Sequence, residues 1–398
     1  MVHFPDGRMK SFGAIPCDNP QLDVAMRFNR PATAMKLIAD PYLNFGEAFM
    51  SGEITVEKGS LWDLLDVLGR NLQDMPPQPV WKRGWNRFKQ ALETRNGLAA
   101  SKRHVAHHYD LSEALYRSFL DTDRQYSCAY FSEPGMTLEE AQRAKKHHLI
   151  AKLDLKPGQK VLDIGCGWGG LAIDIAKASD AQVTGITLSK EQLDVARQRA
   201  RMAGVDDRVR FELIDYRELE GHFDRIVSVG MFEHVGPGNY DGFFAKVKNL
   251  LTDDGVALIH SIGRRGTRGG SNSWIRKYIF PGGYIPSLSQ VTRSTEEAEL
   301  WITDIEILRL HYAETLKHWR ERFLAKRDEM VKLYDERFCR MWEFYLASCE
   351  MSFRHGDMMV FQIQLSKRVD TLPVSRNYMF EREHALNNER AQRSYQYA

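Results

Sequence analysis

Apolar residues follow two different spacings along this chain. The segment 61–72 (LWDLLDVLGRNL) has them at helical intervals and predicts an amphipathic helix near the N-terminus. From residue 160 onward, short β-branched runs alternate with helical segments. The runs that predict strands are 160–165, 182–189, 208–215, 223–230 and 256–263. The segments that predict helices are 171–178, 191–204 and 239–255, the last of which ends in a turn.

This alternation predicts an α/β fold with a mostly parallel sheet, because right-handed crossovers place helices on both faces of such a sheet. The runs 301–311 and 359–368 are expected to add strands, the second of them at the end of the sheet. A Pro-rich break at 74–80 precedes a basic, Trp-bearing segment at 81–90. We therefore predict a smaller N-terminal domain, residues 1–95, and a larger domain, residues 96–398.

Charge and cysteine content narrow the functional classes. The 398 residues include 55 basic and 53 acidic side chains, and this balance argues against a general nucleic-acid binder. The five cysteines form no CxxC pair and no metal-ligand spacing, which fits reduced thiols in a cytosol. Residues 1–10 lack the features of a signal peptide, and no apolar run approaches the roughly 18 residues of a membrane span. We expect a soluble, cytoplasmic protein that reaches membranes only from their surface.

The sharpest motif is VLDIGCGWGG at 161–170, in which a predicted strand leads into four glycines. Glycines permit positive φ and let the backbone pass close to a ligand. A nicotinamide-binding enzyme is the usual competitor, and a purely structural turn is a further alternative. The spacing G-x-G-x-G-G differs from the dinucleotide G-x-G-x-x-G, and the second strand ends in ITLSKEQ (186–192) without a ribose-binding acid. These departures favour S-adenosylmethionine as the cofactor.

Several motifs together resemble one family. VLDIGCGWGG, GITLSKEQ, DYRE, VSVGMFEHVG and LIHSIG occur in the order and spacing of the cyclopropane-fatty-acyl-phospholipid synthase family, which is related to the mycolic-acid cyclopropane synthases. The match continues into HHYDLSEALYRSFLDTDRQYSCAYF upstream and RLHYAETLKHWRERF downstream. The N-terminal DPYLNFGEAFMSGEI is similar to the accessory, lipid-binding domain of phospholipid-acting members. The resemblance implies a Rossmann-like class I methyltransferase fold, with residues 96–398 as the catalytic domain.

The resemblance also implies a reaction and a cofactor pocket. Members transfer the methyl group of S-adenosylmethionine to the cis double bond of an acyl chain and close a cyclopropane ring. The residues that match the family's cofactor site are Tyr126, Ser127, Asp163, Gly165, Cys166, Gly167, Thr187, Leu188, Gln192, Tyr216 and Arg217. The motif implies that Thr187, Leu188 and Gln192 take the ribose. On sequence alone, a surface helix position would be the better interpretation of Gln192.

A second set matches the family's bicarbonate-binding residues, and bicarbonate is the implied base. The set consists of Cys128, Glu233, His260, Ile262 and Tyr312. Glu233 and His260 are expected to follow the fourth and fifth strands, where open α/β sheets bind ligands. Plainer interpretations exist for each: His260 as a buried core histidine, Glu233 as a helix-capping acid and Cys128 as a small buried thiol. Only together, and with the resemblance, do these residues favour a site.

Two segments have the composition of lipid-contacting regions, and two histidine-rich patches raise the question of a metal site. The basic, aromatic segment 263–287 is either a lid that meets lipid phosphates or an ordinary loop over the core. The segment 81–90 resembles an interfacial membrane helix, although an interdomain helix explains it slightly better. The histidine patches at 103–110 and 145–150 lack acidic or Cys ligands at metal spacing, so we predict no metal.

The expected partners are phospholipid acyl chains at the membrane surface and a second copy of the chain, since phospholipid-acting relatives suggest a homodimer built through the N-terminal domain. A same-fold methyltransferase that leaves a methyl or methylene branch, or that methylates a small amine, is the alternative. A non-catalytic lipid-binding protein is disfavoured by the intact Gly165, Gly167, Glu233 and His260. A nucleic-acid methyltransferase is also disfavoured, because the sequence has neither a basic surplus nor an Asn/Asp-Pro-Pro-Tyr motif. The motifs leave ring or branch formation open.

Overall fold

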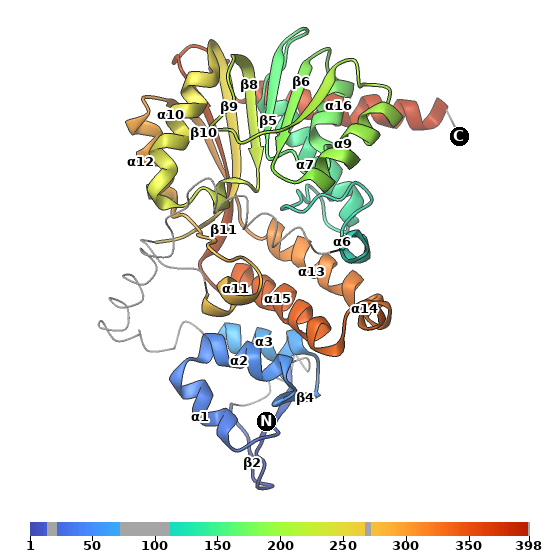
Figure 1. Cartoon of the computed structure of the whole chain (residues 1–398), viewed down its shortest axis with the longest axis vertical. Helices are drawn as coiled ribbons and strands as arrows, with labels where there is room; N and C mark the ends of the chain where they lie inside the picture. Colours follow the sequence, from blue (N-terminus) through green and yellow to red (C-terminus); the bar gives the residue numbers. More distant parts are fainter. Residues whose placement is uncertain (14–21, 72–111, 267–271, 397–398) are drawn as a thin grey trace.

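The computed structural model describes the chain except for residues 14–21, 72–111, 267–271 and 397–398, and it gives no side-chain surroundings for 389–396. Figure 1 shows a large sheet with covering helices at one end, a small N-terminal unit at the other, and a helical layer between them. The predicted domain boundary at residue 95, the Trp-basic segment 81–90 and the histidine patch 103–110 lie outside the described residues.

The large sheet has seven strands in the order β10-β11-β9-β8-β5-β6-β7. Its parallel part contains β5 (Lys160–Ile164), β6 (Gln182–Thr187), β7 (Val209–Leu213), β8 (Phe223–Val229) and β9 (Leu251–Arg264). Strand β11 (Met358–Ser366) pairs antiparallel with β9 on one side and with β10 (Trp301–Leu308) on the other, so β11 alone runs against the rest of the sheet. This confirms the predicted α/β fold with a mostly parallel sheet.

Alternate residues of the strands pack against helices on opposite faces. Val161 and Leu258 belong to an apolar cluster with α7 (Leu138–Lys152), α8 (Gly170–Ala178) and α9 (Lys190–Met202). Their neighbours Leu162 and Ile259 belong to a second cluster with α10 (Tyr240–Leu250) and α12 (Leu288–Glu297). Because both faces are covered, consecutive residues of β5, β8 and β9 are buried, as a parallel sheet requires.

Two details of the predicted sheet are wrong. Residues 251–255 open strand β9 instead of closing a helix, since Leu251 is fully buried and pairs with Phe223. The run 359–368 is not at the end of the sheet: β11 lies between β9 and β10, and β10 forms the edge. The fully buried Val360, Phe361 and Ile363 explain why β11 occupies an interior position.

The helical layer lies between the sheet and the N-terminal unit (Figure 1). It contains α6 (Glu113–Phe119), α11 (Ser273–Tyr278), α13 (His311–Ala325), α14 (Arg327–Leu333) and α15 (Glu336–Arg354), and α16 (Asn377–Gln396) returns to pack on α7. In its described residues, the N-terminal unit has the sheet order β2-β1-β3-β4 and the helices α1 to α3. Its elements are β1 (Val2–His3), β2 (Met9–Lys10), β3 (Ala25–Phe28), β4 (Ile54–Lys58), α1 (Ala32–Ala39), α2 (Pro41–Met50) and α3 (Leu61–Arg70).

Helices α2 and α3 dock the N-terminal unit onto α15 and α11. Trp274 of α11 is fully buried, with its ring centroid 4.7 Å from that of Phe344. Gly46 of α2 allows this close approach, because an added Cβ would lie 2.5 Å from Trp274 Nε1. On α3, the ring of Trp62 lies under the guanidinium groups of Arg320 and Arg354. The first docking point is therefore close aromatic packing, and the second is a pair of cation–π contacts.

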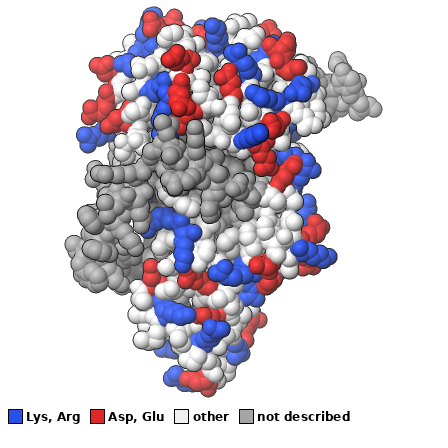
Figure 2. Space-filling view, viewed as in Figure 1, with Lys and Arg blue, Asp and Glu red and all other residues white. Residues whose placement is uncertain are grey.

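Within the described part of the chain, no helix is both long and apolar enough to cross a membrane. Positive and negative side chains are interspersed over the described surface of the face drawn in Figure 2.

Candidate active site

A pocket opens at the carboxyl ends of β5, β6 and β8, where an open α/β sheet binds its ligand. All eleven residues predicted to bind the cofactor line it. Gly165, Gly167 and Gly169 have φ of 81°, 54° and 81°, so the turn after β5 requires residues that tolerate the left-handed region. A Cβ at Gly165 would lie 2.9 Å from Met231 Cβ, while one at Gly167 would meet nothing within 4 Å.

The side of the pocket that is predicted to bind the ribose contains an amide whose orientation is fixed. Thr187 Oγ1 donates to Gln192 Oε1 at 2.9 Å, which fixes the amide so that its NH₂ group is the remaining donor. Ser189 accepts from the Gln192 backbone and begins α9 there. Gln192 is therefore buried in the pocket wall, and the surface-helix interpretation is wrong. Nearby, Arg217 makes an ion pair with the buried Asp215 and lies over the ring of Tyr216.

Asp163 places a buried carboxyl group in the wall of the pocket. The residue is buried, and its Oδ2 has no hydrogen-bond partner among the described residues. Burial raises the pKa of Asp163 to about 7, although the positive charge of Lys145 opposes this shift. A buried carboxylate without a partner is costly, and a cationic ligand would relieve that cost. This buried acceptor therefore fits the α-ammonium group of S-adenosylmethionine.

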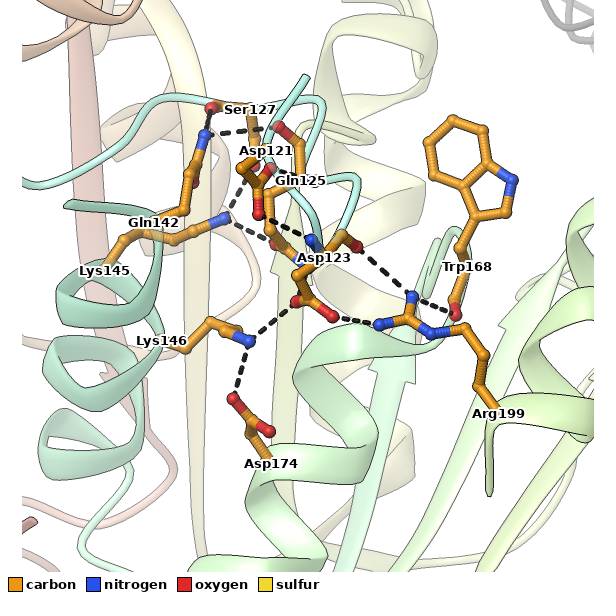
Figure 3. Close-up of polar contacts among 10 residues, drawn as sticks. All are labelled: Asp121, Asp123, Gln125, Ser127, Gln142, Lys145, Lys146, Trp168, Asp174 and Arg199. Carbon is orange, nitrogen blue, oxygen red and sulfur yellow. Dashed lines mark hydrogen bonds and ion pairs between the residues drawn. The ribbon is translucent and has the colours of Figure 1, made fainter. Parts of the chain in front are cut away.

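The loop 121–127, which carries Tyr126 and Ser127 into the pocket, is held by buried polar side chains of α7 (Figure 3). Lys145 donates to Gln125 Oε1 at 2.7 Å and to Ser127 Oγ at 2.8 Å. Gln142 donates to the backbone oxygens of Gln125 and Ser127. Burial lowers the pKa of Lys145 to about 8. Through its hydrogen bond, the buried Lys145 holds the Ser127 side chain in the pocket wall.

The same loop is tied to two further helices (Figure 3). Asp123 binds Lys146 of α7 at 2.6 Å and also pairs with Arg199 of α9. Lys146 in turn binds Asp174 of α8 at 2.6 Å, and Arg199 donates to the Trp168 carbonyl at 2.9 Å. The glycine-rich turn and the loop 121–127 are therefore held in one network.

Glu233 lies in the 3₁₀ helix η3 (Phe232–His234), directly after β8, as predicted. Its Oε1 accepts from the Ile262 backbone N–H at 2.6 Å, and its buried Oε2 has no partner among the described residues. Burial raises the pKa of Glu233 to about 7. This contact joins two of the five residues predicted to bind bicarbonate.

His260 lies within β9, so the prediction that it follows the strand is wrong in detail. It is buried, and its Nδ1 lies 3.1 Å from Gln362 Nε2. Burial and the charges of Lys145 and Lys152 lower the pKa of His260 well below its usual 6.5, so the ring is neutral at pH 7. Its carbonyl accepts from Gly230 N at 2.9 Å, which places this strand beside the pocket wall.

Cys128 and Tyr312 belong to one apolar cluster, and Ile262 packs against that cluster. Cys128 is buried, its thiol donates to the Ala129 carbonyl, and burial raises the pKa of the thiol. Tyr312 lies in the first turn of α13, with its ring edge-on to Trp319. Ile262 thus connects Glu233 to the neighbourhood of Cys128 and Tyr312. The individual roles of all these residues stay predictions.

The described residues of the segment 263–287 pack against the protein itself. Trp274 and Tyr284 are buried, and Lys277 and Tyr278 both bind Glu47 of the N-terminal unit. In the second histidine patch, His148 makes ion pairs with Glu306 and Glu383. No group of three or more His, Cys, Asp or Glu with the arrangement of a metal site occurs among the described residues.

Sequence reasoning missed Gln142, Lys145 and Gln362. A signal was present, because Leu138, Gln142, Lys145 and Leu149 share one helical face, which predicts burial for the two polar members. The fold and its pocket define a class I S-adenosylmethionine-dependent methyltransferase, with an open α/β sheet, a glycine-rich turn after β5 and ligand residues at the strand ends.

Comparison with known proteins places the chain more closely. The family model of mycolic acid cyclopropane synthetase matches residues 97–363, and a domain of unknown function (DUF7884) matches residues 1–75. The cyclopropane-fatty-acyl-phospholipid synthase of Escherichia coli K12 is 39% identical over 90% of both chains. A probable fatty acid methyltransferase of Pseudomonas putida is 38% identical over 86% of this chain and 87% of its own. The chain belongs to the mycolic acid cyclopropane synthetase family.

A solved structure agrees with this assignment. The mycolic acid cyclopropane synthase CmaA1, in complex with S-adenosylhomocysteine (SAH) and CTAB, matches with a TM-score of 0.63 and 36% identity. The match covers 66% of this chain and 97% of CmaA1. The protein is an S-adenosylmethionine-dependent methyltransferase of the cyclopropane synthase type.

Proposed function

We propose that the enzyme transfers the methyl group of S-adenosylmethionine to the cis double bond of an unsaturated phospholipid acyl chain and closes a cyclopropane ring, with bound bicarbonate as the base. The observation that carries the proposal is the buried Oε2 of Glu233, which has no hydrogen-bond partner among the described residues. Glu233 binds the strand that also carries the neutral His260 ring, and Ile262 of that strand packs against the apolar cluster of Tyr312. The relative of Escherichia coli that is named for a phospholipid product aligns over 90% of this chain, which supports the substrate class.

The chemistry explains why such a site suits the reaction. The alkene is a weak nucleophile, and its attack on the sulfonium methyl leaves a carbocation that closes the ring when the new methyl loses a proton. Bicarbonate supplies a proton acceptor, a function that typically contributes ~10² to 10⁴ in rate. Glu233, His260 and Tyr312 would hold that anion through their polar atoms. The surrounding apolar cluster would exclude water, which would otherwise trap the cation as an alcohol.

A branched product is the second candidate. The Pseudomonas putida relative is named a probable fatty acid methyltransferase, and its identity of 38% is nearly that of the Escherichia coli enzyme. Both outcomes share the methyl transfer and differ in the proton that is removed. We further propose that the protein works as a homodimer in the cytoplasm, bound peripherally to the inner membrane face.

The test is incubation of the purified protein with S-adenosylmethionine and vesicles of a cis-monounsaturated phospholipid, followed by gas chromatography–mass spectrometry of the acyl chains. A cyclopropane product that depends on added bicarbonate and is lost in Glu233→Gln would support the proposal. The exposed Glu220→Gln is the matched control and should behave as the wild type. A branched product would overturn ring closure, and full activity without bicarbonate would overturn the assignment of the base.

A further inference from the structure

A continuous network of polar side chains connects His260 to the C-terminal helix α16. Gln362 on β11 is the cross-strand neighbour of His260 on β9. Lys152 of α7 donates to Gln362 Oε1 at 2.8 Å and also binds Glu306 of β10. Beyond Glu306, His148 binds both Glu306, at 2.6 Å, and Glu383 of α16, at 3.0 Å. Five elements of the fold therefore contribute to the environment of one ring.

The donors and acceptors in this network fix the orientation of the Gln362 amide. An ammonium group has only donors, so Lys152 must face the oxygen of the Gln362 amide. The NH₂ group of Gln362 then faces His260, and its Nε2 lies 3.1 Å from Nδ1. An amide NH₂ group only donates, so Nδ1 of His260 has to accept. A flipped amide would set NH₂ against the ammonium and is excluded for the same reason.

The charge of Glu306 keeps Lys152 in its ionised, hydrogen-bonding form. Burial alone would raise the pKa of Glu306, but His148 and Lys152 lower it to about 2, so the carboxylate is ionised at pH 7. It therefore provides the counter-charge that Lys152 needs in its buried position. In the described part of the chain, Gln362 is the sole hydrogen-bond partner of the His260 ring.

We propose that Lys152 and Gln362 are positioning residues that lock His260 in the neutral tautomer with its proton on Nε2. The consequence, which rests on the proposed function, is that His260 offers an N–H donor to a bound oxyanion such as bicarbonate. A ring with Nε2 protonated and Nδ1 occupied cannot also accept the proton of the new methyl group. His260 therefore binds the base and is not itself the base.

The tautomer can be measured directly in the wild-type protein. Uniform ¹⁵N labelling of histidine and long-range ¹H–¹⁵N correlation spectra distinguish a protonated ring nitrogen from an unprotonated one. The His260→Gln variant identifies the signals of His260 by their loss. The proposal expects Nδ1 to be unprotonated and Nε2 protonated at pH 7. A protonated Nδ1 in the wild type overturns it, whatever the variants do.

Gln362→Glu tests the positioning role. A carboxylate in this place accepts from Lys152 and also from His260, so it should move the ring proton to Nδ1. We expect kcat to fall by about 10²- to 10⁴-fold, with little change in KM for S-adenosylmethionine. Gln182→Glu is the control: it introduces the same carboxylate at the exposed first position of β6, away from His260, Gln362 and Lys152. It should leave the His260 signals unchanged.

The two proposals fail in different ways. Activity that is independent of bicarbonate would refute the proposed base while the Nε2–H signal of His260 still supports the tautomer. A Gln362→Glu variant that folds, shifts the ring proton and keeps full kcat would overturn the positioning role. A Gln362→Glu spectrum with Nδ1 still unprotonated would overturn the donor–acceptor argument itself.

Discussion

Asp163 should make binding of the cofactor release protons. In the ligand-free protein, burial raises the pKa of this carboxyl group to about 7, about three units above its usual 3.8. That shift corresponds to about 4 kcal/mol by which burial disfavours the carboxylate. A bound ammonium group near Asp163 would restore the carboxylate, because a nearby positive charge favours the ionised form.

The sign of the effect follows from the raised pKa. Below pH 7 the carboxyl group of the free protein is protonated and must lose its proton when the ligand binds. We expect release of about a tenth of a proton at pH 8, about half at pH 7 and about nine-tenths at pH 6. The affinity for SAH should accordingly be constant at high pH and fall about tenfold for each pH unit below 7.

Isothermal titration calorimetry with SAH in buffers of different ionisation enthalpy measures the released protons. Asp163→Asn should abolish the release and weaken binding at pH 8, whereas Glu233→Gln should retain the release. This second variant matters because the pKa of Glu233 is also about 7. No proton release at pH 6, or an unchanged release in Asp163→Asn, would refute the pairing of Asp163 with the cofactor.

The other predictions concern packing and reactivity. Gly46→Ala should lower the free energy of unfolding by about 1–3 kcal/mol in urea titrations, because its Cβ would lie 2.5 Å from Trp274 Nε1. Gly242→Ala, in α10 with nothing within 4 Å of the new Cβ, should instead raise it by up to about 1 kcal/mol. Trp62→Ala should cost about 1–2 kcal/mol by removing two cation–π contacts, and an unchanged urea midpoint would contradict this. Cys128 should resist alkylation at pH 8 in the native protein and react after unfolding, as followed by mass spectrometry, because its buried thiol has a raised pKa.

The sequence predicts the sheet well wherever apolar periodicity decides the structure. The strands at 160–165, 182–189 and 223–230 are confirmed, because β-branched runs between turns have few alternatives. Residues 251–255 were predicted as the end of a helix, since TDDG is typical of a turn, but pairing with β8 draws them into β9. The interior position of β11 could not be predicted, because strand order depends on contacts between distant segments.

In the candidate site, the residues that line the pocket could be predicted, but the residues that support them could not. Motif matching located the pocket residues, and the structure gathers all eleven predicted cofactor residues around one pocket. The supporting residues were missed because a lone Lys or Gln in a helix or strand usually indicates solvent. Lys145 and Gln362 are buried only because partners from other elements satisfy them, and a single sequence does not show those partners.

The docking of the N-terminal unit limits how far the protein can be shortened. Family members such as the cyclopropane mycolic acid synthase 1 of Mycobacterium tuberculosis align over 66% of this chain and 96% of their own. Cutting this chain to that length would strip Trp274 and Phe344 of the α2 surface that covers them and would leave Arg320 and Arg354 without Trp62. We therefore expect the methyltransferase unit of this chain to be destabilised when it is expressed alone, and a free-standing version to need a more polar surface over α11 and α15.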